Sequence, residues 1–133
     1  MKTIRVVAAI IKAVNENGEP IIFATQRGYG DFKGGWEFPG GKIEEGETSQ
    51  EALIREIKEE LDADGSPIKL IKTVEYDYPK FHVTIHLILC DLVSDHVVLK
   101  EHEDAKYIKK EDFKILEFLP ADYLLFDELE KYL

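Results

Sequence analysis

Three glutamates between residues 56 and 60 have the clearest capacity for chemistry in this sequence. Glu59 and Glu60 follow Glu56 by three and four residues, so on a helix all three share one face. Like charges placed in this way repel, at a cost of roughly 0.2–0.5 kcal/mol per pair. A cation bound between them would remove that cost, and carboxylate oxygens suit hard divalent cations. The trio therefore predicts a metal site, although a solvated acidic helix explains the same residues without one.

The residues before the trio predict the helix that would position it. Thr48, followed three residues later by Glu51, has the form of a capping box, in which a hydroxyl and a carboxylate bind backbone N–H groups at a helix start. Neither Gly nor Pro interrupts the run that follows. Apolar residues recur at helical spacing and predict a packed stripe: Leu53, Ile57, Leu61 and, beside them, Ile54. The carboxylates would lie on the neighbouring face.

The stretch from Gly41 to Ala63 carries a longer pattern. Five residues separate Gly41 from Glu47 and seven separate Glu47 from Arg55, which directly precedes the acidic trio. This resembles the Nudix box, G-x5-E-x7-R-E-U-x-E-E-x-G-U, where U is apolar. One fixed position departs from it, because Asp62 stands where the family has Gly. A left-handed residue normally ends a helix there, and Asp adopts that conformation more readily than most residues.

The resemblance implies a metal-dependent hydrolase. In the family the box glutamates hold Mg²⁺, for which Mn²⁺ is a possible substitute, together with a backbone carbonyl. The implied ligands here are Glu56, Glu59, Glu60 and the carbonyl of Gly40. Glu47 and Arg55 would be structural supports of the loop and helix that carry them.

A later charged segment, residues 99–104, is implied to supply a further acidic group. It precedes a predicted short strand, 105–108, and resembles the MutT-type segment that provides another metal ligand or activates water. Counting back from Tyr107 gives Glu101 as the matching carboxylate, with Glu103 as the alternative. The implied catalytic carboxylates are then Glu56, Glu59 and Glu101. Either Glu56 or Glu101 would be the base that takes a proton from the attacking water.

Three residues are implied to bind the nucleotide. Arg27 ends the segment FATQR, Phe38 lies in WEFPGGK at residues 36–42, and Asp122 closes LPAD at residues 119–122. Each segment resembles a MutT-type element. The residue types alone also allow a surface charge at Arg27, a core position for Phe38 and a helix cap at Asp122. As an ionised carboxylate, Asp122 would only accept hydrogen bonds, and should select bases that present N–H donors, such as guanine and cytosine.

The remaining pattern predicts strands around this helix. The expected elements are a strand at 3–14 buried on both faces, a turn at 15–18, a strand at 20–27, a turn at 64–67, strands at 68–78 and 81–93, and a C-terminal helix from Pro120. His82 and His86 lie on one expected strand, about 13 Å apart at ~3.3 Å per residue, too far to share one zinc ion. They are expected on a polar or pocket-facing sheet surface. The resemblance implies one domain, 1–133, with the Nudix α/β/α sandwich around a mixed β-sheet.

Composition and charge limit the partners. The net charge of −10 argues against binding a nucleic-acid polymer, and a phosphate substrate would need a cation to offset the repulsion. The single cysteine, Cys90, excludes an internal disulfide and fits a reducing compartment. No apolar run is long enough for a membrane span or a signal peptide. We expect a cytoplasmic protein, as a monomer or homodimer.

The sequence therefore predicts metal-dependent hydrolysis of a nucleoside triphosphate to a monophosphate and pyrophosphate. The resemblance favours an oxidised guanine or a cytidine nucleotide, in nucleotide-pool housecleaning. Two alternatives remain: a hydrolase of another nucleoside diphosphate linked to a group X, and a nucleotide sensor that keeps the fold without catalysis.

Overall fold

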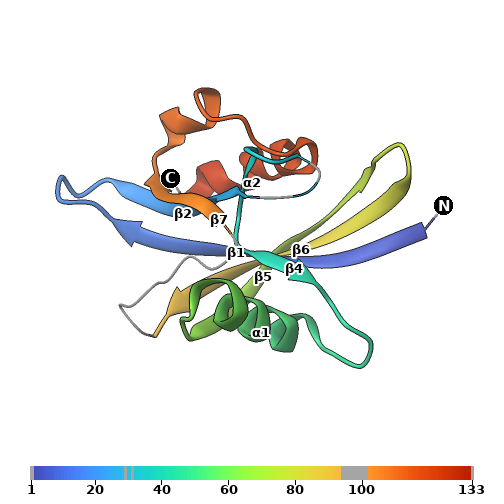
Figure 1. Cartoon of the computed structure of the whole chain (residues 1–133). Coiled ribbons are helices and arrows are strands. Elements are labelled where there is room, and N and C mark those ends of the chain that lie inside the picture. Colours follow the sequence, from blue (N-terminus) through green and yellow to red (C-terminus); the bar gives the residue numbers. More distant parts are fainter. Residues whose placement is uncertain (1, 29, 31, 94–101, 133) are drawn as a thin grey trace.

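A mixed seven-stranded sheet separates two helical layers in the computed structural model, which describes residues 2–28, 30, 32–93 and 102–132. Helix α1 (Ser49–Leu61) covers one face, and the short helices of the C-terminal part cover the other (Figure 1). These are η1 (Lys110–Lys114), η2 (Pro120–Leu125), α2 (Phe126–Leu129) and η3 (Glu130–Tyr132). The predicted α/β/α sandwich with a mixed sheet is confirmed. No helix in these described ranges is long and apolar enough to cross a membrane.

Strand β1 (Lys2–Val14) is the centre of the sheet. It pairs in parallel with β6 (Phe81–Leu92), and antiparallel with β2 (Pro20–Arg27) and with β4 (Gly40–Lys42). The strand order is β3-β2-β1-β6-β5, with β4 on β1 and β7 on β2. The other strands are β3 (Trp36–Glu37), β5 (Gly65–Asp77) and β7 (His102–Ile108). The strands predicted at 3–14 and 20–27, with a turn between them, are confirmed as an antiparallel hairpin. Strand β4 places Gly40 and Gly41 beside the middle of β1.

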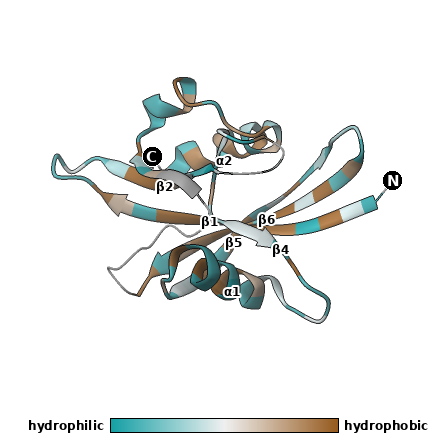
Figure 2. Cartoon of the chain, viewed as in Figure 1, coloured by the Kyte–Doolittle hydropathy of each residue, from teal (hydrophilic) through white to brown (hydrophobic). Residues whose placement is uncertain are grey.

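The middle of β1 carries the core on both faces. Its residues 7–11 are all buried, while its two ends are partly exposed, so burial on both faces is confirmed only for the middle. Ala8 and Ile10 belong to the cluster under the C-terminal layer, and Val7, Ala9 and Ile11 to the cluster under α1. Figure 2 shows hydrophobic residues concentrated where β1 and β6 run between the layers.

Helix α1 begins and ends as its sequence predicts. Thr48 accepts a hydrogen bond from the backbone of Glu51, whose side chain binds the Thr48 N–H in return. Asp62 ends the helix in the left-handed conformation, with φ 52° and ψ 36°. The predicted packing stripe is fully buried at Leu53, Ile57 and Leu61. Including Ile54 in it was wrong, because that side chain is 46% exposed; one residue further on turns it about 100° away from the sheet.

Two other element predictions need correction. Residues 64–67 are not a turn, because β5 begins at Gly65, which pairs with Leu92. β5 is an edge strand of the described sheet, where Pro67 is tolerated because its missing N–H need not face a partner strand. The C-terminal segment is not one helix but η2, α2 and η3 in succession. The i+3 spacing of its apolar residues fits the three residues per turn of a 3₁₀ helix.

Candidate active site

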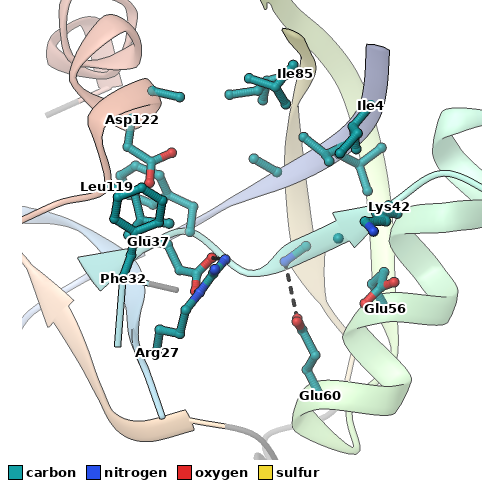
Figure 3. Close-up of a pocket in the computed structure, with 18 of the residues that line it drawn as sticks. Ile4, Arg27, Phe32, Glu37, Lys42, Glu56, Glu60, Ile85, Leu119 and Asp122 are labelled. Atoms are coloured by element: carbon teal, nitrogen blue, oxygen red, sulfur yellow. Dashed lines mark hydrogen bonds and ion pairs between the residues drawn. The ribbon is translucent and has the colours of Figure 1, made fainter. Parts of the chain in front are cut away.

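A cavity of about 710 Å³ lies between α1, β4 and the C-terminal layer. Its lining includes most of the residues that the sequence singled out, arranged in two groups (Figure 3). One end carries Glu56, Glu59 and Glu60 of α1 beside Gly40, Gly41 and Lys42 of β4. The other end carries Arg27 of β2, Glu37 of β3 and Asp122 of η2. The cavity therefore joins the acidic helix face to the segments expected to bind a nucleotide.

Two adjacent glycines bring β4 close to both β1 and α1. At Gly40 a Cβ would lie 1.9 Å from the backbone oxygen of Val7, and φ is +156°. At Gly41 a Cβ would lie 2.4–2.6 Å from the carboxylate atoms of Glu56. A side chain at Gly40 would have to displace the backbone of Val7, whereas a side chain at Gly41 would displace only the end of the Glu56 side chain. The absence of a side chain at Gly41 is what lets the Glu56 carboxylate lie against β4.

Arg55 joins the loop to the acidic face of α1. Its Nε and Nη2 donate to the two carboxylate oxygens of Glu47 at 2.7 and 2.9 Å, and Nη2 also donates to the carbonyl of Lys42 at 2.9 Å. Its Nη1 donates to Glu56 at 2.9 Å and to Glu59 at 3.2 Å. The guanidinium lowers the pKa of Glu47 to about 2. Arg55 and Glu47 thus connect α1 to the loop between β4 and α1, the position expected of structural supports.

Glu60 takes a different partner from the rest of the trio. It is a buried carboxylate, and its Oε2 accepts the N–H of Gly40 at 3.2 Å (Figure 3). Glu56 and Glu59 point to Arg55, while Glu60 points to Gly40. Within the described ranges, no group of three or more acidic, His or Cys side chains is arranged to hold a metal ion. The donors are nevertheless carboxylate oxygens lining one cavity, a set whose chemistry fits a hard divalent cation.

The opposite end of the cavity contains a charged pair and a buried acid. Arg27 donates from Nε and Nη2 to the carboxylate of Glu37 at 2.9 and 3.0 Å. Asp122 is only 7% exposed, and its Oδ2 has no hydrogen-bond partner in the described part of the chain. Burial raises the pKa of Asp122 well above its ordinary value, the charge of Glu37 raises it further, and Arg27 opposes the shift. This does not fit the expectation of an ionised carboxylate.

The helix-cap interpretation of Asp122 is also wrong. The N-cap of η2 is Leu119, and Asp122 lies inside the helix with no side-chain capping bond. Arg27 is not simply a surface charge, since it lines the cavity and pairs with Glu37. Phe38 fits both interpretations offered for it: it is buried in the core, 5.5 Å from the ring of Phe118, and it lines the cavity.

Comparisons with known proteins agree with this geometry. Residues 3–129 match the NUDIX domain family. The chain belongs to the NUDIX family. It is 31% identical over 132 residues to the 8-oxo-dGTP diphosphatase of Escherichia coli (strain K12), covering 98% of this chain and 99% of that one. It is 32% identical over 129 residues to the CTP pyrophosphohydrolase of the same organism, covering 96% and 91%.

A solved structure extends the likeness to the fold. The MutT protein from Methanosarcina mazei Go1 has a TM-score of 0.78 and 27% identity, covering 98% of this chain and 93% of that one. These relatives, with the family match, make this chain a MutT-like Nudix hydrolase, of the class that acts on acid anhydride bonds. The resemblance read from the Nudix box is therefore confirmed.

Other expected residues lie elsewhere or outside the described ranges. Glu101 is outside them, and the side chain of Glu103, on β7, is not described. His82 lies on a polar surface, with Nδ1 2.6 Å from Asp77, whose hydrogen bond raises the pKa of His82. Burial lowers the pKa of His86. Neither histidine lines this cavity.

Three charged residues of the Nudix cavity were missed in the sequence. They are Glu37, Lys42 and Glu44, all of which line it. Glu37 and Lys42 stand in WEFPGGK, where only the aromatic and glycine positions were interpreted. Glu44 lies within the box at a variable position, and its carboxylate is 3.8 Å from Nη1 of Arg55. Their proximity to the Nudix box was the available signal.

Proposed function

We propose that this Nudix hydrolase converts a nucleoside triphosphate to a nucleoside monophosphate and pyrophosphate in the presence of Mg²⁺ or, as a substitute, Mn²⁺. One observation carries the proposal: a single cavity joins the acidic face of α1 to the group formed by Arg27, Glu37 and Asp122. The phosphates of a nucleotide need the cation that the acidic face would hold. The nucleobase needs the polar groups at the other end of the cavity. The relatives named for 8-oxo-dGTP and for CTP support oxidised guanine or cytidine nucleotides as the preferred substrates.

The acidic end would hold the cation. The expected ligands are Glu56, Glu59, Glu60 and the carbonyl of Gly40. A bound cation would offset phosphate charge and lower the pKa of an attacking water. Either Glu56 or Glu101 would be the base that takes a proton from that water. Arg55 and Glu47 hold the loop against α1, which keeps these carboxylates at the cavity.

The other end would hold the nucleoside. Arg27 and Asp122 present polar groups to the cavity, while Phe38 closes its apolar side. This pairing of a few polar groups with apolar walls is typical of small-molecule sites, whose volumes run from about 300 to 1,000 Å³. A nucleobase has the matching combination of an apolar face and a polar edge.

Replacing Glu59 tests the metal assignment. Because its side chain is 57% exposed, Glu59→Gln should change the free energy of unfolding by no more than about 0.5 kcal/mol. Since it removes one cation ligand, it should lower kcat/KM in Mg²⁺ by at least about a hundredfold. Glu45→Gln is the matched control, because Glu45 is exposed and does not line the cavity. Wild-type rates from Glu59→Gln would contradict the assignment.

A substrate panel separates this proposal from its alternatives. Ordinary and oxidised guanine, cytosine and thymine triphosphates, together with nucleoside diphosphates linked to a sugar or a second nucleoside, would be incubated with the protein and Mg²⁺. Nucleoside monophosphate, pyrophosphate and phosphate would each be quantified, because hydrolysis of a linked diphosphate yields a nucleoside monophosphate and a phosphorylated X, with no free phosphate or pyrophosphate. Pyrophosphate release from a triphosphate supports the proposal, and cleavage of the linked diphosphates alone replaces the substrate class. Tight binding without release across the panel would indicate a sensor.

A further inference from the structure

Asp122 lies in surroundings that do not suit a negative charge. Its Oδ2 is shielded from water and has no hydrogen-bond partner within the ranges that the structure describes. Among the residues that the structure describes, the charged and titratable groups near it are Arg27 on β2, Glu37 on β3 and Tyr78, in the turn after β5. Figure 3 shows Asp122, Glu37 and Arg27 on the same side of the cavity. The acid therefore faces one cation, one anion and one phenol.

The nearby cation does not by itself offset an Asp122 charge. Arg27 donates two hydrogen bonds to Glu37, at 2.9 and 3.0 Å, so its charge is shared with that carboxylate. The hydroxyl of Tyr78 accepts the N–H of Ala121 at 3.1 Å, which ties the β5–β6 hairpin to the segment that carries Asp122. A buried carboxylate with one oxygen that has neither a hydrogen-bond partner nor access to water is far less stable than the neutral acid.

We propose that Asp122 is a neutral carboxylic acid at neutral pH, that it donates its O–H to an acceptor on the nucleobase, and that Glu37 is the positioning residue that keeps it neutral. The part concerning the nucleobase rests on the proposed function. Glu37 acts in two ways: it fixes the guanidinium of Arg27, and its negative charge disfavours ionisation of Asp122.

The neutral form changes the class of base edge that fits. A carboxylic acid presents an O–H donor and a carbonyl acceptor side by side, as the amide of Asn presents a donor and an acceptor. The complementary edge has an acceptor adjacent to an N–H donor. A base edge with two adjacent acceptors leaves the carbonyl of Asp122 without a donor, and an edge with two adjacent donors leaves its O–H without an acceptor. Asp122→Asn should therefore keep the order of preference among nucleotides, whereas an ionised Asp122 would make that substitution change the order.

Infrared spectroscopy tests the protonation state without any activity. The difference spectrum between wild type and Asp122→Asn at neutral pH should contain the C=O stretch of a protonated carboxyl group. In Glu37→Gln, whose Asp122 has lost its negative neighbour, that band should vanish at a lower pH than in wild type. Glu19→Gln is the control, because Glu19 pairs with Lys109 and does not line the cavity. A carboxylate band for Asp122 at neutral pH would overturn the proposal.

Binding of nucleoside monophosphates without metal tests the hydrogen bond to the base. For the nucleotide that binds most tightly, wild-type affinity should fall by about tenfold as Asp122 loses its proton, since one hydrogen bond is lost. The affinity of Asp122→Asn should not change over the same pH range. A wild-type affinity that is independent of pH, or no measurable binding, would overturn the proposal. Failure of the proposed function appears separately, as an absence of turnover in Mg²⁺ while the infrared band remains.

Discussion

At the scale of the residue, two carboxyl groups of this protein are pushed in opposite directions by their neighbours. Glu47 accepts hydrogen bonds from Nε and Nη2 of Arg55, and its pKa falls to about 2. Asp122 is buried beside Glu37, and its pKa rises well above its ordinary value. The first environment is local in sequence and follows from the Nudix box. The second depends on β3 and η2 meeting in space, so reading LPAD alone suggested an ionised group.

Glu47 should make the protein sensitive to acid over a defined range. Because the pKa is lower in the folded than in the unfolded chain, ionised Glu47 stabilises the fold above its ordinary pKa of 4.5. This contribution should be lost as the pH falls from 4.5 towards about 2. Glu47→Gln should therefore be less stable than wild type at neutral pH, with the difference disappearing near the lower limit. Urea unfolding at a series of pH values measures this; a constant difference would contradict it, and Glu45→Gln serves as the control.

Asp62 leads to a second prediction for a single residue. Its left-handed conformation costs Gly nothing, so Asp62→Gly should raise the free energy of unfolding, by at most about 1 kcal/mol. A weak exposed contact partly offsets this gain, since Asp62 lies 3.8 Å from Nζ of Lys58. Activity should hardly change, because Asp62 does not line the cavity.

Urea unfolding and turnover of the same preparation check the Asp62 prediction. Asp62→Ala is the matched control. It should be less stable than Asp62→Gly, because the Cβ of Ala makes the left-handed conformation at this position unfavourable, whereas Gly adopts it freely. A clearly destabilised Asp62→Gly would indicate that the aspartate contributes more through its contacts than its conformation costs.

At the scale of the element, the parts of the fold with local signals were predictable and those that depend on distant partners were not. The start of α1 follows from Thr48 and Glu51, which lie within one turn of each other. The start of β5 follows from pairing with the far end of β6, so Gly65 and Pro67 misleadingly indicated a turn. The acidic face of α1 was predictable, as was the contact of Glu59 with Arg55 four residues before it on the same helix. The contact of Glu60 with Gly40 was not, because it depends on the position of β4.

The two glycines of β4 should fail in different ways when replaced by alanine. Gly40→Ala places a Cβ against the backbone of Val7, so it should destabilise the pairing of β4 with β1 and lower the Tm. Gly41→Ala meets only the end of the Glu56 side chain, which can turn away. It should keep most of its stability but bind Mg²⁺ more weakly and turn over more slowly, because the Glu56 carboxylate is displaced. Calorimetry and a Mg²⁺ titration of activity separate the two outcomes; equal loss of Tm in both variants would contradict this.

At the scale of the whole molecule, the central sheet makes the two helical layers depend on each other. β1 contributes Ala8 and Ile10 to the core cluster under the C-terminal layer, and Ala9 and Ile11 to the cluster under α1. The cavity is lined by β4, which pairs with β1 in this sheet. Its acidic end lies on α1, which packs on one cluster, and its other end includes Asp122 of η2, in the layer that packs on the other cluster. This arrangement favours one domain, whose two faces unfold together.

A substitution on one face should therefore be detected by a probe on the other. Ile57 is fully buried under α1, so Ile57→Ala should cost about 2–5 kcal/mol of unfolding free energy. Trp36, the single tryptophan, lies in the opposite cluster. In a single cooperative unit, its fluorescence and the far-ultraviolet circular dichroism should report the same shifted urea midpoint. Ile54→Ala is the matched control on the same helix and should shift neither by more than about 0.5 kcal/mol, because Ile54 is exposed. If Ile57→Ala shifted the helical signal and left the Trp36 transition at the wild-type midpoint, the two faces would be separate folding units, and the proposal of one domain would be wrong.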